Sequence, residues 1–106
     1  MRALSAVVVS LLAFAVAPAT AGAAKWVGLG DSFAAGPLIP NQSLSPLGCL
    51  RSSKNFARLA AASGGHTLTD VSCSGARTTH MTASQSTDAG TNPPQFNGIA
   101  SDNNVS

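Results

Sequence analysis

The chain has 106 residues, of which only 9% are charged, and six basic side chains stand against four acidic ones. A formal charge of +2 at this length provides no basic patch of the kind that binds nucleic acid or an anionic membrane surface. A chain this short forms one small domain at most and buries only about 60% of its unfolded surface, so its core needs further support.

The chain begins with the pattern of a secretion signal. Met1 and Arg2 give a short basic start, and residues 3–17 form a largely apolar run that ends before Pro18. The run is shorter than the roughly 20 residues that a membrane-spanning helix needs, and no stop-transfer charges flank it. We therefore predict a cleaved signal peptide, a secreted extracellular protein and no stable membrane anchor.

Cleavage is expected after Ala23, the end of one of two Ala-x-Ala sites; the earlier site ends at Ala21. The secreted protein should therefore begin at Ala24, or at Gly22 if the earlier site is used. Amino-terminal sequencing of secreted protein checks this prediction. Recovery from the membrane fraction of a chain that still starts at Met1 would contradict the signal peptide.

The first predicted elements are a strand and a short helix joined by a turn. Residues 25–29 have the pattern of a short buried strand, and residues 30–32 turn it into a helical segment at residues 33–35. Residues 36–48 contain three prolines among polar side chains, which is typical of a surface loop.

A longer helix follows, and Ser52 or Ser53 is its expected cap. Apolar side chains recur at helical spacing within residues 56–60, and good helix formers continue through Ala62. The two glycines at positions 64–65 are expected to end this helix.

A second strand is predicted at residues 67–73, where small, polar and β-branched side chains alternate, and residues 74–76 turn out of it. Strand, helix and strand form a βαβ unit, so the predicted fold class is α/β with a parallel sheet. Residues 78–106 are rich in Thr, Ser, Asn, Gly and Pro, and we expect no further core element there beyond a weak helix at residues 95–100. The last residues, 102–106, have the pattern of an approach to another strand.

The two turns after the strands are the candidate site. Parallel strands end at one edge of the sheet, so Gly30, Asp31 and Ser32 should lie beside Ser74 and Gly75. A serine in the first turn of a helix is exposed near the positive end of the helix dipole, and its own N–H can help to hold an oxyanion. Gly75 has no side chain to keep a second N–H from the same oxygen, as a tetrahedral acyl intermediate requires. A small secreted binding or structural module, closed by a disulfide, that uses Gly-Asp-Ser only as a helix cap remains the alternative.

Three stretches carry a family resemblance: residues 26–36 are WVGLGDSFAAG, residues 48–56 are GCLRSSKNF and residues 68–76 are LTDVSCSGA. They resemble the first block, the cysteine-arginine-serine stretch and the second block of the GDSL or SGNH hydrolases, particularly secreted actinobacterial lipases and esterases. The resemblance implies a three-layer α/β/α SGNH-hydrolase fold with a parallel sheet. Residues 24–106 would be its incomplete amino-terminal part, with only the first βαβ portion present.

The resemblance also implies roles for individual residues. Ser32 would be the catalytic nucleophile, and the N–H groups of Ser32 and Gly75 would be oxyanion-hole donors. Gly30 and Asp31 would support the nucleophile turn, and Asp31 would not be a triad acid. The implied reaction is the cleavage of carboxylic esters of lipids or small acyl groups through an acyl-serine intermediate.

Two family blocks are absent from these 106 residues. The Gly-Thr-Asn at residues 90–92 begins like the G-x-N-D block but continues with proline, and no strand is expected before it. Neither His66 nor His80 follows an aspartate by three positions, as the D-x-x-H block requires, and we expect both on the surface. Without a base Ser32 stays protonated, so the chain is expected to be inactive alone.

A disulfide is predicted between Cys49 and Cys73, because an exported chain meets oxidising conditions. Cys49 precedes the amino end of the long helix, which lies at the same edge of the sheet as the carboxyl end of the second strand. Neither cysteine has the close spacing to His66 or His80 that zinc ligands show, so we expect no metal. We also expect no cofactor, an ester as the small-molecule partner, no nucleic-acid partner and a monomer.

Overall fold

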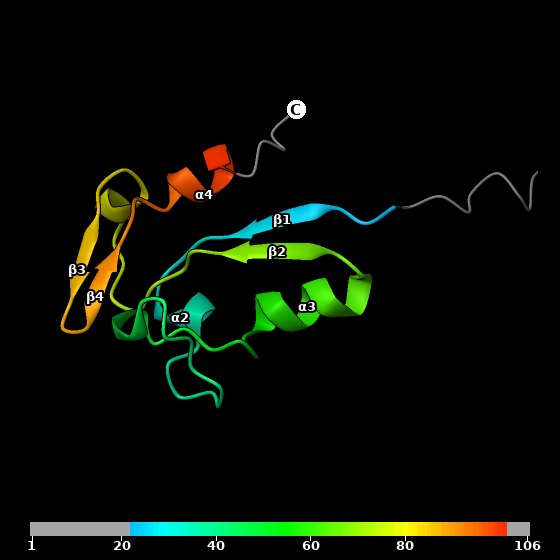
Figure 1. Ribbon diagram of the computed structural model, residues 1–106, viewed down its shortest axis with the longest axis horizontal. Helices are drawn as coiled ribbons and strands as arrows, with labels where there is room; N and C mark the ends of the chain where they lie inside the picture. The colour runs from blue at the N-terminus through cyan, green and yellow to red at the C-terminus, as the bar shows by residue number, and fades with distance from the viewer. Residues whose placement is uncertain (1–21, 102–106) are drawn as a thin grey trace, which may run out of the picture.

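The computed structural model describes residues 22–101. Most of the predicted signal peptide, and the predicted strand approach at residues 102–106, lie outside the described residues. The elements in chain order are β1 (Lys25–Gly28), α2 (Ser32–Ala35), η1 (Leu47–Cys49), α3 (Phe56–Gly64), β2 (Thr67–Asp70), η2 (Thr78–Met81), β3 (Gln85–Thr87), β4 (Gly90–Asn92) and α4 (Phe96–Ser101) (Figure 1).

A parallel pair of strands organises the fold. β1 and β2 pair in register from Lys25 opposite Thr67 to Gly28 opposite Asp70. α3 connects the two strands and lies along β2 (Figure 1). This is the predicted βαβ unit, and the α/β class with a parallel sheet is confirmed.

Both strands are shorter than predicted, and the first is not buried. β1 ends at Gly28 and β2 at Asp70, whose carboxylate accepts from both the N–H and the hydroxyl of Ser72. Trp26 is 37% exposed, contrary to the expected buried strand. Within the described residues β2 is the only strand that pairs with β1, and half of β1's residues are exposed.

The long helix is capped by Asn55, so the prediction of Ser52 or Ser53 was wrong. The Asn55 side-chain oxygen accepts the backbone N–H three residues later at 3.0 Å. Ser52 is used elsewhere, because its hydroxyl donates to the Pro40 carbonyl at 2.6 Å and holds the preceding loop. The expected end of the helix is confirmed, with Gly65 in the left-handed region at φ 70°.

An antiparallel hairpin of β3 and β4 was missed by the sequence analysis. Its strands carry polar side chains, and Gln85 and Asn92, which lie opposite each other, are both buried. The expectations of no core element after residue 78 and of no strand before residues 90–92 were therefore wrong. The predicted helix at residues 95–100 is present as α4, shifted by one residue.

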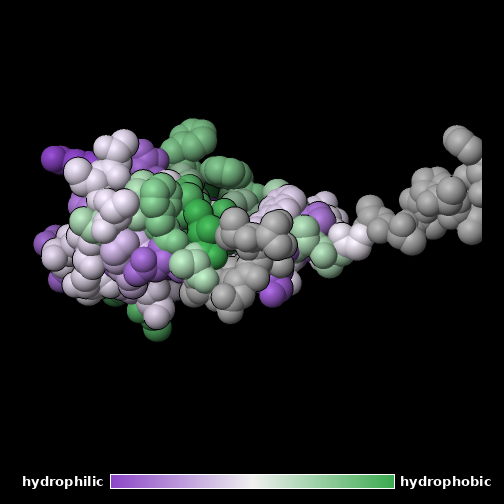
Figure 2. All heavy atoms as spheres, turned by 90° about the horizontal axis from the view of Figure 1, so that it is seen from above, coloured by the Kyte–Doolittle hydropathy of each residue, from purple (hydrophilic) through white to green (hydrophobic). Residues whose placement is uncertain are grey.

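The core is built from small side chains and buried amides. Its buried hydrophobic residues are Ala35, Cys49, Ala61 and Cys73. Larger apolar side chains such as Phe33, Phe56 and Leu59 are exposed, and Figure 2 shows hydrophobic residues gathered in a strip across one face. No helix within residues 22–101 is long and apolar enough to cross a membrane.

Candidate active site

The turn between β1 and α2 places Ser32 at the first position of a one-turn helix. Asp31 caps this helix, since its carboxylate accepts the Phe33 N–H at 3.0 Å. Gly30 has φ +145°, and a Cβ at this position would lie 2.8 Å from the Ala34 Cβ. Only glycine fits both conditions, so the geometry of the turn requires Gly30.

Ser32 has no structural task in the part of the chain that the structure describes. Its side chain is exposed, and its hydroxyl makes no hydrogen bond to any of residues 22–101. Asp31 alone supplies the side-chain cap of α2. The hydroxyl of Ser32 is therefore available to a ligand.

The turn after β2 lies beside the turn after β1, as expected for the ends of parallel strands. The Cys73 N–H donates to the Gly30 carbonyl at 3.0 Å. Gly75, two residues further on, has φ +83° in the left-handed region. Within residues 22–101, neither the Ser32 N–H nor the Gly75 N–H donates to another protein atom. Two neighbouring turns thus each offer a free donor.

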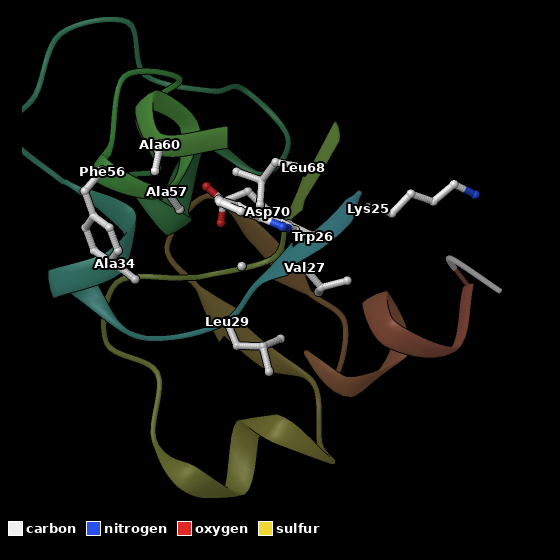
Figure 3. A pocket seen from close by; sticks show the side chains of 11 residues that line it. Lys25, Trp26, Val27, Leu29, Ala34, Phe56, Ala57, Ala60, Leu68 and Asp70 are labelled. Atoms are coloured by element: carbon white, nitrogen blue, oxygen red, sulfur yellow. The ribbon is translucent and has the colours of Figure 1, made fainter. Parts of the chain in front are cut away.

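Three hollows lie near these turns, and one of them, of about 530 Å³, is lined by Ser74, Gly75 and Gln85. A shallow one of about 470 Å³ is lined by Gly30, Asp31, Ala76, Arg77, Thr78 and Met81. A larger one of about 550 Å³ lies between the sheet and helices α2 and α3, with Phe56, Ala57 and Ala60 on the helix side (Figure 3). Ser32 lines neither the shallow nor the larger hollow, but Asp31 and Ala76, the chain neighbours of Ser32 and Gly75, line the shallow one, whereas the larger one is a gap in the apolar packing. We place the candidate site at the shallow one.

The two histidines are half-buried and held by backbone groups. His66 Nδ1 accepts the Ala24 N–H at 2.9 Å, and its ring stacks on Trp26 at the start of β1, away from the turns. His80 Nδ1 accepts the Arg77 N–H at 2.9 Å. A neutral imidazole with an accepting Nδ1 carries its proton on Nε2, whereas the base of a serine hydrolase needs a bare Nε2. Neither histidine is arranged as that base.

The Asn92 side chain is held by hydrogen bonds to neighbouring segments. Its Nδ2 donates to the Val71 carbonyl at 3.1 Å, and its Oδ1 accepts from Arg51 at 3.2 Å. The side chain is buried, with Asn92 only 3% exposed. Its carboxamide is therefore not free to donate to an oxyanion.

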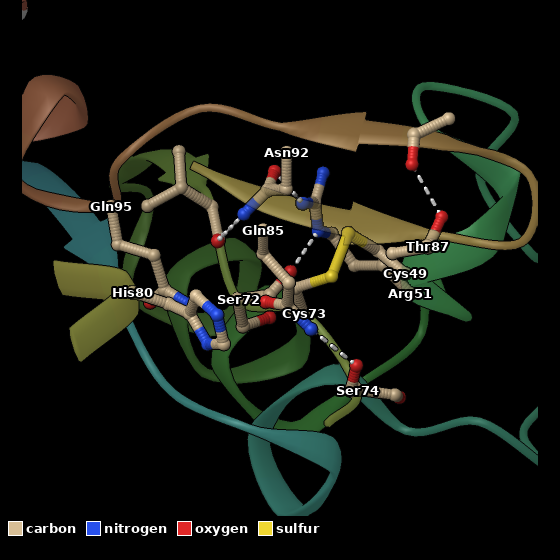
Figure 4. Close-up of a disulfide and its surroundings, with 12 residues drawn as sticks. Cys49, Arg51, Ser72, Cys73, Ser74, His80, Gln85, Thr87, Asn92 and Gln95 are labelled. Carbon is tan, nitrogen blue, oxygen red and sulfur yellow. Dashed lines mark hydrogen bonds between the residues drawn. A yellow bond between two sulfur atoms is a disulfide. The ribbon is translucent and has the colours of Figure 1, made fainter. Parts of the chain in front are cut away.

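The predicted disulfide is present. Cys49 and Cys73 are bonded and both are buried (Figure 4). The Ser74 N–H donates to the Cys49 carbonyl at 2.9 Å. Disulfide and hydrogen bond together tie the loop before α3 to the turn that carries Gly75.

Arg51 joins that turn to the hairpin. Its Nε donates to the Ser72 carbonyl at 2.6 Å, and its Nη2 donates to Asn92 in β4. The Asp70 carboxylate lies 4.0 Å from Nε. Burial lowers the pKa of the Arg51 guanidinium, and the Asp70 charge opposes this shift.

Two buried glutamines also reach the candidate site, and the sequence analysis missed both. Gln95 binds the backbone of Gly30, and Gln85 Nε2 donates to the Ser74 carbonyl at 2.9 Å. No local sequence pattern marks either glutamine as a contact of the site, because its partner is a backbone group elsewhere in the chain.

Comparisons with known proteins agree with the sequence blocks. No family model matches the chain. "Lipase 2" of Streptomyces coelicolor is 38% identical over 85 residues, an alignment that covers 73% of this chain and 29% of that protein. The crystal structure of an extracellular lipase from Streptomyces rimosus matches with a TM-score of 0.52 and 38% identity, covering 56% of this chain and 26% of that one.

The chain spans less than a third of the length of both relatives. The level of identity in each match confirms the resemblance that the motifs predict. This chain is similar in both sequence and fold to part of the Streptomyces lipases.

Proposed function

We propose that Ser32 is the nucleophile of a secreted serine ester hydrolase that cleaves carboxylic esters of lipids or small acyl groups. The observation that carries the proposal is the pairing of an exposed, unbonded Ser32 hydroxyl with two free N–H donors on adjacent turns. Similarity to two Streptomyces lipases supports the same reaction class.

The reaction uses these groups in two steps. Ser32 Oγ attacks the ester carbonyl carbon and gives up its proton to a base, while the carbonyl electron pair moves onto oxygen. The N–H groups of Ser32 and Gly75 hold that oxyanion. Collapse breaks the bond to the alcohol, which leaves with the proton, and water then releases the carboxylic acid from the acyl-serine in the same manner.

Gly30 and Asp31 support this chemistry by shaping the nucleophile turn. We further propose that residues 24–106 form the amino-terminal part of an SGNH hydrolase domain. The share of the relatives that the chain spans supports this assignment, as does the absence of a D-x-x-H sequence from the 106 residues.

An organophosphonate ester probe tests the proposal. The protein encoded by the complete reading frame is treated with the probe, digested and examined by mass spectrometry. Ser32 should carry a single adduct, since attack of its Oγ on phosphorus expels the leaving group of the probe. An adduct on another serine, or none at all, would contradict the assignment.

The 106-residue chain alone should not hydrolyse a short-chain chromogenic ester above background. It has no D-x-x-H histidine, and both of its histidines accept backbone N–H groups through Nδ1. Initial rates for the purified chain and its Ser32→Ala variant check this prediction. Robust hydrolysis that vanishes in the variant would mean that His66 or His80 serves as the base.

The alternative, a small secreted binding or structural module, has one observation in its favour. Asp31 does cap α2, so Gly-Asp-Ser has a structural role. That role involves Gly30 and Asp31 but not the Ser32 hydroxyl. Labelling of Ser32 therefore separates the two functions.

A further inference from the structure

Gln95 holds the residue that precedes the Asp31–Ser32 pair. Its side chain is fully buried, with 0% of the residue exposed. The Gly30 N–H donates to Gln95 Oε1 at 2.8 Å, and Gln95 Nε2 donates to the Gly30 carbonyl at 2.9 Å. One carboxamide thus binds the N–H and the carbonyl of one residue, as a neighbouring strand would.

Gly30 has a backbone conformation that benefits from such support. Its φ of +145° lies in a region that glycine enters freely, so the backbone itself restrains it weakly. The Gly30 carbonyl also accepts the Cys73 N–H, which links it to the turn of Gly75. Gln95 therefore acts where the two turns of the candidate site meet.

The backbone of Gln95 is itself held by hydrogen bonds. Its N–H donates to the His80 carbonyl at 3.0 Å, and its carbonyl accepts the Gly98 N–H at 3.0 Å. Figure 4 shows the chain leaving β4 and running to Gln95, next to His80. The hairpin that precedes it is anchored by the Asn92 to Arg51 hydrogen bond. A side chain held in this way can transmit position to the turn that it binds.

We propose that Gln95 is a positioning residue for the nucleophile: it holds the backbone of Gly30 and so fixes Ser32 relative to the Gly75 N–H. This inference rests on the proposed function of Ser32. A shift of about 1 Å in a reacting group costs on the order of 10²-fold in rate, so loss of the contact should slow acylation without changing substrate binding.

The test uses the protein encoded by the complete reading frame and two variants. Gln95→Met keeps the length of the side chain and loses both hydrogen bonds. Gln95→Glu keeps an acceptor for the Gly30 N–H but donates to its carbonyl only when protonated. Gln42→Met is the matched control, because Gln42 also binds backbone carbonyls, those of Gly36 and Ile39 after α2, but not Gly30.

Titration with the phosphonate probe counts competent sites, and the time course gives the labelling rate for each site. Gln95→Met should keep the number of sites, while the labelling rate and kcat fall about 10- to 100-fold and KM stays nearly unchanged. Gln42→Met should match the unaltered protein in the number of sites and in the labelling rate. A purely structural role predicts the reverse: fewer titratable sites, each reacting at the normal rate.

The Gln95→Glu variant adds a pH readout. Burial raises the pKa of a carboxyl group, and the protonated acid can donate to the Gly30 carbonyl as the amide does. Its labelling rate, divided by that of the unaltered protein at each pH, should therefore rise as the pH falls. This ratio cancels the pH dependence that both proteins share.

Each result decides the inference. An unchanged labelling rate in Gln95→Met, fewer sites with normal reactivity, or a pH-independent ratio in Gln95→Glu overturns it and leaves the nucleophile assignment intact. No labelling of Ser32 in the unaltered protein overturns the proposed function and this inference together.

Discussion

In the protein encoded by the complete reading frame, replacing Ser32 with alanine should lower the kcat for ester hydrolysis by a factor on the order of 10³ or more. The change removes the oxygen that attacks the carbonyl carbon. It keeps the backbone N–H at position 32. The fold should survive, because the side chain is exposed and its hydroxyl has no partner in the described residues. The Asp31 cap remains, and alanine favours helix at this position.

Initial rates on a short-chain chromogenic ester measure the loss, and urea unfolding measures the stability, which should change by less than about 0.5 kcal/mol. Ser63→Ala is the matched control. Ser63 is also an exposed helical serine, in α3, and its variant should keep full activity. Hydrolysis that persists in Ser32→Ala would refute the nucleophile assignment and the proposed function with it.

The βαβ unit could be predicted because its signals are local. The apolar strand before Gly30, the helical spacing from Phe56 and the glycines after α3 each act over a few residues. The cap of α3 could not, because Ser52 and Asn55 are both good caps. The hydroxyl of Ser52 binds the Pro40 carbonyl across the loop, and this tertiary contact leaves the cap to Asn55.

The hairpin could not be predicted because its buried side chains are polar and are held by hydrogen bonds. Gln85 and Asn92 in the hairpin, and Gln95 just after it, are each at most 5% exposed. Their partners are the Ser74 carbonyl, Arg51 and the Gly30 backbone, all of them distant in sequence. Hydrophobic periodicity, the main signal for a strand, does not register such residues.

The candidate site was predictable in its layout and less so in its support. The rule that parallel strands end at one edge places the turns of Ser32 and Gly75 together, and the Cys73 to Gly30 hydrogen bond agrees with it. Motif resemblance added the roles of these residues, which stay predictions. The contacts of Arg51 and Gln95 that hold the turns depend on geometry that no local pattern encodes.

Removing the Cys49 to Cys73 disulfide should lower the free energy of unfolding by about 3–4 kcal/mol. The two cysteines are 24 positions apart, so the bond closes a loop that the unfolded chain would otherwise explore freely. The effect is large for this protein, because the buried hydrophobic residues of the described part are only alanines and the two cysteines.

The measurement is urea unfolding of the protein and of a Cys49→Ala, Cys73→Ala double variant, which leaves no buried thiol or hydroxyl behind. Alkylation without reductant, followed by mass spectrometry, first establishes the state of the cysteines. Two alkylated cysteines in folded secreted protein, or equal unfolding free energies, would contradict the prediction. The Ser74 N–H donates to the Cys49 carbonyl, so the double variant should also show faster amide exchange at Ser74 than at Val71, whose N–H donates to the carbonyl of Gly28 at the end of β1. Loss of the disulfide would then loosen the turn of Gly75 before the paired strands.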